Sequence, residues 1–244
     1  MDQRLSTNRV LANLPAEMAM TLAPHLTSIE LNQGDRLLQA GKPVEQIVFP
    51  LSGVVSIQVT VSSGIAVETA VIGREGVVGA ASASLPQALN DAVVRVPGTA
   101  QALPMVRFAD ALKQSPVLAE HIARSTASLL AQAQQTAACN ATHTAEARIC
   151  RWLLDLQDRC DDDVIPVTQE CLSEMLGLQR TTVTLIASRL QSLEAIRCRR
   201  GKIRVLNRAP LEHGACECYG RMLRYSKELY PTQAAPVPAA TAVA

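Results

Sequence analysis

The chain has 244 residues, which is long for one ordinary domain and sufficient for two. Hydrophobic residues make up 48% of it and aromatic residues only 2%, so its cores have to be built from aliphatic side chains. The formal net charge of +1 excludes a uniformly basic protein that coats nucleic acid, so any site for a polyanion has to be a local cluster of charge.

No segment of the sequence is typical of a membrane-spanning or exported protein. The charge-poor stretch from Ser125 to Ala145 carries too many Gln, Asn, Ser and Thr side chains to cross a bilayer. The N-terminus lacks the apolar core of a secretory signal. We therefore expect a cytoplasmic protein with no membrane partner. The seven cysteines are an odd number and none precedes Cys139, which favours free thiols over a disulfide framework.

The first part of the chain has the pattern of a small β-roll. After a short helical lead-in at residues 8–26, Val- and Ile-rich runs alternate with Gly and Pro from Ile29 to about Leu103. Turn sequences recur at roughly ten-residue intervals, as in a compact sandwich or barrel, at residues 32–35, 40–43, 51–53 and 62–64.

Two helices are predicted next, one over residues 108–113 and a longer one from Pro116 to about Asn140. On the longer helix, Leu118, Ile122 and Leu129 belong to a 4-3 series that is apolar in its first half and polar in its second. This series is compatible with a helix packed on its own roll and with a two-stranded coiled coil between subunits. We favour the second interpretation, which makes these three residues dimer contacts, because a DNA-reading motif follows.

Residues 167–193 are predicted to form two short helices joined by a tight turn, after a further amphipathic helix at residues 144–159. Thr168 is a good N-cap for the first of the pair and Gly177 supplies the turn. Helix, turn and helix in this order form the geometry that reads DNA. Polar side chains displayed on this unit are candidate contacts to base edges and phosphates: Thr168, Gln169, Gln179, Arg180, Thr181, Thr184 and Ser188.

A basic β-hairpin is predicted directly after the second helix, over residues 196–206. Between Gln179 and Arg208 there are eight Lys or Arg residues against one Glu, whereas the first 114 residues carry eight basic and nine acidic residues. A basic hairpin alone is usually a solvated surface, but its position beside the helix pair favours DNA binding. Its candidate contacts are Arg199, Arg200 and Lys202.

This order of elements resembles the Crp/Fnr superfamily of bacterial transcription regulators over nearly the whole chain. The matching segments are Gly34-Asp35, Gly41, Val48-Phe49 and Ser52-Gly53 in the roll, residues 146–154 in the helix that opens the DNA-binding domain, and residues 168–180 in the helix-turn-helix.

The resemblance implies an α+β fold with an N-terminal β-roll of the cyclic-nucleotide-binding-like jelly-roll type, a long dimerisation helix and a C-terminal winged helix-turn-helix. It also implies a homodimer that reads a palindromic operator in double-stranded DNA, under control of a small-molecule effector sensed by the roll. RNA polymerase is a further candidate partner, and no enzymatic activity is expected.

The predicted division of the chain is residues 1–114 for the roll, 115–142 for the dimerisation helix, 143–230 for the DNA-binding domain and 231–244 for a disordered, Pro- and Ala-rich tail.

The sequence departs from the cyclic-AMP-responsive members of the superfamily at two places. In the second helix, Thr181 stands where those members have the Glu that reads cytosine, which implies a different operator. In the roll, residues 78–80 keep the Gly of the ribose-binding pair without its Glu, and residues 88–92 lack the phosphate-binding Arg. We therefore do not expect cyclic AMP to bind in the usual way. Gly73, Arg74, Glu75 and Gly79 remain candidate effector contacts, although an exposed turn is the simpler interpretation.

The cysteines leave a redox or metal role open. The superfamily's iron-sulfur members have clustered N-terminal cysteines without counterpart here, so no iron-sulfur cluster is expected. His213, Cys216 and Cys218 place three soft ligands close together, but a zinc site needs a fourth. We expect buried, apolar cysteines and no metal, while a thiol switch that uses Cys139 or Cys150 stays open.

Two other classes of function explain the sequence less well. A hydrolase is disfavoured because the four His residues are scattered and no Gly-x-Ser-x-Gly motif occurs. A ligand-binding or thiol- or metal-responsive module with weak or no DNA reading explains the roll but leaves the basic hairpin unexplained.

Overall fold

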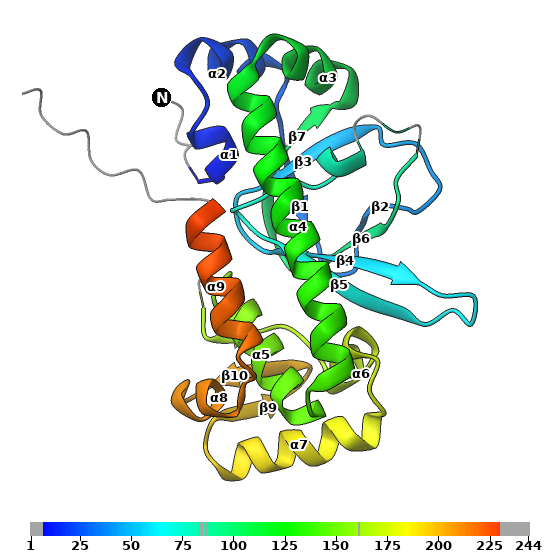
Figure 1. Ribbon diagram of the computed structural model, residues 1–244, viewed down its shortest axis with the longest axis vertical. Coiled ribbons are helices and arrows are strands. Elements are labelled where there is room, and N and C mark those ends of the chain that lie inside the picture. Colours follow the sequence, from blue (N-terminus) through cyan, green and yellow to red (C-terminus); the bar gives the residue numbers. More distant parts are fainter. Residues whose placement is uncertain (1–6, 83–84, 86, 161, 230–244) are drawn as a thin grey trace, which may run out of the picture.

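The computed structural model describes residues 7–82, 85, 87–160 and 162–229. A β-roll fills the upper half of the molecule in Figure 1, a smaller domain of helices and short strands lies below it, and the long helix α4 runs along both. The predicted α+β fold class is therefore confirmed. The predicted tail at residues 231–244 lies outside the described residues.

The roll consists of two antiparallel sheets with strand orders β1-β7-β3 and β2-β6-β4-β5. Gly53 illustrates how a predicted turn is fixed, because its φ is +79° and a Cβ there would lie 2.5 Å from the carbonyl oxygen of Val96. The strands are β1 (Thr27–Leu31), β2 (Arg36–Leu38), β3 (Gln46–Pro50), β4 (Val54–Thr60), β5 (Ala66–Ile72), β6 (Asp91–Val96) and β7 (Gly98–Pro104), with a short 3-10 helix, η2 (Ala80–Ser82), between β5 and β6.

Short helices close one end of the roll. Asn8 fastens the first of them, because its side chain caps α1 and also donates hydrogen bonds to the carbonyl oxygens of Pro50 and Gly76. Phe49 and Phe108 are fully buried in the core beneath. These helices are α1 (Arg9–Ala12), α2 (Ala16–Leu22), η1 (Ala23–His25) and α3 (Met105–Gln114).

Helix α4 (Pro116–Thr142) begins as predicted, with Pro116 in its first turn and the Ser115 side chain as its N-cap. The apolar part of its 4-3 series, however, packs on the protomer's own roll. Leu118 and Ile122 are 0% and 7% exposed in the core of the roll, and Leu129 packs on the sheet core. Leu118 and Ile122 are therefore corrected as dimer contacts, because the protomer's own roll covers their side chains. The dimer contact of the half-buried Leu129 stays a prediction. Among the described residues, no helix is long and apolar enough to cross a membrane.

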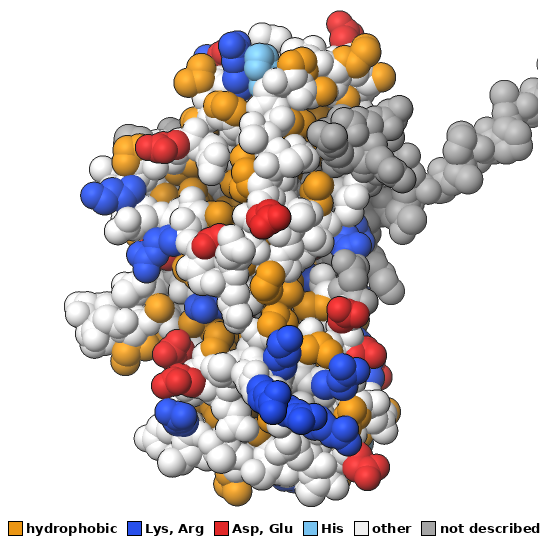
Figure 2. Space-filling view, turned by 180° about the vertical axis from the view of Figure 1, so that it is seen from behind, with side chains coloured by type: hydrophobic (Ala, Val, Ile, Leu, Met, Phe, Trp, Pro, Cys, Tyr) orange, Lys and Arg blue, Asp and Glu red, His pale blue; other side chains and the backbone are white. Residues whose placement is uncertain are grey.

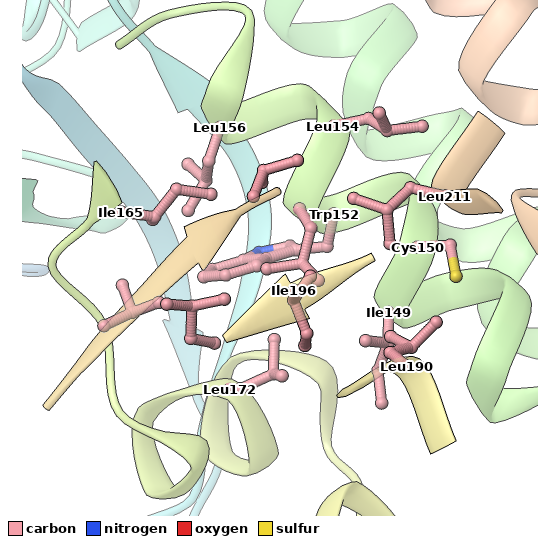
Figure 3. Close-up of a cluster of buried hydrophobic side chains, with 14 of the residues drawn as sticks. Ile149, Cys150, Trp152, Leu154, Leu156, Ile165, Leu172, Leu190, Ile196 and Leu211 are labelled. Atoms are coloured by element: carbon pink, nitrogen blue, oxygen red, sulfur yellow. The ribbon is translucent and has the colours of Figure 1, made fainter. Parts of the chain in front are cut away.

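The second domain is built around one aliphatic core with the chain's single tryptophan at its centre. Figure 3 shows Trp152 surrounded by Ile149 from its own helix, Leu172, Leu190 and Ile196. The elements are α5 (Ala145–Gln157), β8 (Val164–Ile165), α6 (Gln169–Leu176), α7 (Arg180–Ser192), β9 (Ile196–Arg199), β10 (Lys202–Val205), α8 (Ala209–Gly214) and α9 (Cys218–Leu229). The three strands form an antiparallel sheet in the order β8-β10-β9, and α9 returns along α4.

The two domains contact each other through buried polar groups. The indole Nε1 of Trp152 donates a hydrogen bond of 2.6 Å to a carboxylate oxygen of Glu68, on β5. Burial raises the pKa of Glu68, although hydrogen bonds from Ser56 and Trp152 oppose the shift. The folded protein therefore holds a proton on this carboxyl more tightly than the unfolded chain does.

This burial predicts that the Glu68→Gln variant is more stable than the wild type at neutral pH. Because the folded-state pKa is raised, the ionised carboxylate costs stability as the pH rises above the ordinary carboxyl value of about 4.3. Gln keeps an oxygen that accepts from Trp152 and removes the charge. We expect its Tm to be higher by a few degrees at pH 7 and the difference to vanish toward pH 4. Thermal melts across this range measure it, and Glu30→Gln, on an exposed strand position, is the control that shows no such gain.

Candidate nucleic-acid interface

The predicted helix-turn-helix is present, and nearby residues determine where α6 begins and where it ends. The Thr168 hydroxyl accepts a hydrogen bond of 3.0 Å from the backbone N–H of Cys171 and so begins α6. Gly177 ends α6 in the left-handed conformation, with φ 60°. The N–H of Gly177 donates to Glu174 O, and the N–H of Leu178 donates to Ser173 O, as in a Schellman motif.

Helix α7 has one buried face and one exposed polar face. The buried face carries Val183, Ile186, Ala187 and Leu190, as its spacing predicts. The exposed face carries the predicted contact residues Arg180, Thr181, Thr184 and Ser188, preceded by exposed Gln179 at the N-cap. Leu185 lies among them with 73% of its surface exposed, which leaves an apolar side chain on this face.

Two side chains of α6 support this face. The Thr184 hydroxyl donates a hydrogen bond of 3.1 Å to the side-chain oxygen of Gln169, and so joins the two helices. The Arg180 guanidinium lies 3.3 Å from a carboxylate oxygen of Glu170, with both side chains more than half exposed. An exposed pair of this kind contributes little stability and is easily exchanged for a phosphate or a base.

The hairpin after α7 is a wing with a two-residue turn. Arg199 pairs with Lys202, and between them Arg200 and Gly201 have φ values of 48° and 75°, which is the pattern of a type I′ turn. Arg199, Arg200 and Lys202 are exposed at this tip. Figure 2 shows a group of Lys and Arg side chains in the lower part of the molecule, at the height of α7 and the wing in Figure 1.

The positive charge of this region is smaller than its count of basic residues indicates. Arg189 pairs with Glu146 at 3.0 Å, and Arg208 pairs with Asp158 and Glu212, both at 2.7 Å. Arg180 is paired as well. Between Gln179 and Arg208, the described basic residues that make no ion pair are those of the wing: Arg197, Arg199, Arg200, Lys202 and Arg204. The wing is therefore the strongest local attraction for a polyanion.

The candidate effector residues lie elsewhere and do not form a free pocket together. Arg159, in the turn that follows α5, donates a hydrogen bond of 2.8 Å to the Glu75 carboxylate, which also accepts from Gly73 N at 3.2 Å. Burial opposes ionisation of Glu75, but the Arg159 guanidinium outweighs it and lowers the pKa of that carboxyl. The backbone of Arg74 accepts from Arg9 N, and Gly79 packs against Val44 and Ile47.

The Glu75 carboxylate connects the roll to the second domain through Arg159. Both residues also line a cavity of about 300 Å³, together with polar residues of both domains that include Arg9, Arg151 and Asp155. The expected effector contact of Glu75 therefore stays a prediction.

Four of the seven cysteines are buried, and three of these four lie together. Cys150 is buried among apolar groups, and this burial raises the pKa of its thiol to about 11, which makes it unreactive. Cys139, Cys216 and Cys218 are also buried, but they lie together in one cluster. His213, the predicted third member of the C-terminal group, is exposed and does not belong to the cluster.

Comparison with known proteins agrees with this architecture. Residues 147–213 match the family model of the Crp-like helix-turn-helix domain. A search of curated proteins found no match to the chain.

Solved structures share the fold at low identity. FixK2 from Bradyrhizobium japonicum is 18% identical, with 78% of this chain and 98% of that chain covered and a TM-score of 0.67. A Crp/Fnr-family transcriptional regulator from Thermus thermophilus is 22% identical, with 78% and 98% covered and a TM-score of 0.64. The c-di-GMP responsive global regulator CLP of Xanthomonas campestris is 16% identical, with 78% and 99% covered and a TM-score of 0.63.

A β-roll joined through a long helix to a winged helix-turn-helix is the two-domain architecture that the chain shares with these solved structures. The chain has the Crp/Fnr fold, and its residues 147–213 form a Crp-like helix-turn-helix domain. The predicted resemblance to the Crp/Fnr superfamily is therefore confirmed, and a DNA-binding regulator is the function that these comparisons support.

Proposed function

We propose that this protein is a homodimeric transcription regulator that reads a palindromic operator in double-stranded DNA and is controlled by an effector acting on its roll. The observation that carries the proposal is the exposed polar face of α7 beside the unpaired basic side chains of the wing. A recognition helix with a flanking basic hairpin has the parts needed for base reading and for phosphate contact.

The proposed division of labour follows the position of each side chain. Residues at the start of α7 and along its exposed face would contact base edges, whereas the cap of α6 and the wing would contact phosphates. The base-contacting set is Gln179, Arg180, Thr181, Thr184 and Ser188, and the phosphate-contacting set is Thr168, Gln169, Arg199, Arg200 and Lys202.

We further propose that the dimer forms through the outward face of α4. This face carries a second series with 4-3 spacing, the spacing of a two-stranded coiled coil, and every member is exposed or half-buried: Ala123, Ala127, Leu130, Gln134, Ala137 and Ala141. The small side chains would allow two helices to approach closely, and Leu130, 59% exposed, would supply the apolar centre. Two recognition helices would then enter major grooves about one turn, ~34 Å, apart.

The effector is proposed to act on the contacts between the roll and the DNA-binding domain. The Glu75–Arg159 ion pair, the Glu68–Trp152 hydrogen bond and the cavity of about 300 Å³ lie at this boundary. A molecule that loosens or strengthens them would change the position of α7 relative to α4. The residues that replace the family's ribose and phosphate contacts argue against cyclic AMP bound in the usual way.

Selection of bound duplexes from a random DNA pool tests the proposal. We expect purified protein to enrich an inverted repeat whose half-sites are separated by about one helical turn. Enrichment of a single half-site would contradict the dimer. Binding without any enriched sequence would contradict sequence reading by α7 in the effector-free protein.

The competing function is a ligand-binding or thiol-responsive module that does not read DNA. The dependence of affinity on salt separates the two functions. Phosphate contacts by several Lys and Arg residues predict a steep fall of affinity with rising salt. In a plot of the logarithm of the affinity against the logarithm of the salt concentration, the steepness of the slope should be close to the number of contacts. A flat dependence would favour the module.

A further inference from the structure

Cysteine and histidine side chains from two distant parts of the chain meet at the lower end of α4. Cys139 lies in the last turn of α4, and His143 is the C-cap residue that follows this helix. Cys216 precedes α9 and Cys218 is its first residue. The ligand atoms of these four residues, three Sγ and one imidazole nitrogen, all lie within 4.8 Å of one another.

The spacing of these atoms is close to that of a tetrahedral metal site. The Sγ atoms of Cys139 and Cys216 are 3.5 Å apart, and Cys218 Sγ is 3.6 Å from His143 Nδ1. Ligands at Zn–S distances of about 2.3 Å in tetrahedral geometry lie roughly 3.5–3.8 Å from one another. The thiols are free and far beyond the S–S bond length of about 2.05 Å. Side-chain movements of about 1 Å therefore bring all four onto one ion.

The surroundings of the cluster are those of a structural site. Cys139, Cys216 and Cys218 are 0%, 8% and 1% exposed, and Ala147 packs against them, so solvent has little access. The Nε2 atom of His143 lies 3.2 Å from a carboxylate oxygen of Glu217, while Nδ1, on the other side of the ring, lies 3.6 Å from Cys218 Sγ. A carboxylate behind a ligating histidine is the usual outer partner in zinc sites.

A polar side chain also contacts the cluster. The Gln135 side chain donates a hydrogen bond of 2.9 Å to Cys218 Sγ, which is a contact that a zinc-bound thiolate accepts. Three thiolates and a neutral imidazole would leave a zinc site with one net negative charge.

We propose that Cys139, His143, Cys216 and Cys218 bind a single Zn²⁺ ion that fastens the end of α4 to the DNA-binding domain. A Cys₃His set with buried sulfur atoms is a typical closed zinc site. The ion connects the junction of α4 and α5 with the segment between α8 and α9, and so fixes the direction in which the DNA-binding domain leaves α4. The expectation of apolar, inert cysteines is thereby replaced for three of the seven.

Metal analysis of the full-length protein, purified under reducing conditions without chelator, tests the proposal independently of DNA binding. We expect one zinc per chain by elemental analysis. Cys216→Ser and His143→Asn should reduce zinc to background. Cys171→Ser and His213→Asn are matched controls outside the cluster and should retain it. Removal of the ion by a chelator should lower the Tm of the wild type, and added Zn²⁺ should restore it.

Cobalt supplies a readout that needs no variant. Co²⁺ added to the metal-free wild-type protein should give the intense visible bands of a tetrahedral site and the near-ultraviolet thiolate-to-cobalt bands, and Zn²⁺ should abolish both. Absence of these bands, or equal zinc content in the cluster variants and the controls, would overturn the proposal. So would a disulfide between Cys139 and Cys216 in metal-free protein as purified, detected as the loss of two titratable thiols.

Discussion

The Arg180→Ala variant is expected to lose roughly 1–3 kcal/mol of affinity for the selected operator, which is about a 5- to 150-fold rise in Kd. Arg180 is the first residue of α7, its side chain is 70% exposed, and a guanidinium placed there reaches a guanine with two hydrogen bonds. Its pairing with Glu170 is between exposed groups and is easily given up. Fluorescence anisotropy with the operator, and with duplexes changed at one base pair at a time, measures the effect. The variant should lose discrimination at one base pair of each half-site.

Lys202→Ala is the matched control, since it also removes one positive charge from the interface. Lys202 lies at the tip of the wing, where a phosphate contact is expected, so its loss should weaken binding to all duplexes alike. The logarithm of the affinity should fall less steeply with the logarithm of the salt concentration in this variant, by about one unit of slope. If both variants weaken every duplex to the same extent, Arg180 does not read a base and the proposed division between α7 and the wing is wrong.

The DNA-binding half could be predicted in detail because its determinants are local. The Thr168 cap, the left-handed Gly177 and the alternating strands on either side of Arg200 and Gly201 each act over a few residues. The predicted bounds of the second helix agree with α7 to within one residue. Helix α6 begins directly after the predicted N-cap, Thr168. Local rules of this kind need no knowledge of the remaining chain.

The contacts that the sequence left undetermined are long-range. The 4-3 spacing of Leu118 and Ile122 indicates an apolar face on α4, but the same spacing fits a partner helix and the protomer's own roll. The exposed series gives no comparable signal in the sequence, because its alanines are only weakly hydrophobic. Cys139 and Cys216 are 77 residues apart, so their proximity depends on the path of α9 along α4. Nothing in the sequence marks His143 as a metal ligand until the path of α9 is known.

The exposed series on α4 makes a second prediction of large effect, for the Leu130→Asp variant. In a two-fold symmetric dimer, a residue at the centre of the seam lies close to its own copy. Two aspartates would then be buried side by side, where desolvation and like charge both oppose association. We expect this variant to sediment as a monomer. Its affinity for the inverted repeat should fall by roughly 100-fold or more, because the second half-site no longer benefits from a linked partner.

The folded state of the protomer should be unaffected, since Leu130 is 59% exposed in the single chain. Leu89→Asp is the matched control, because Leu89 is 67% exposed on the roll, is not part of the α4 series and should leave the dimer intact. Binding to an isolated half-site should be equal in both variants and the wild type, which separates loss of the dimer from damage to α7. A Leu130→Asp protein that remains dimeric would place the interface on another face, and the geometry of two recognition helices would have to be derived anew from that face.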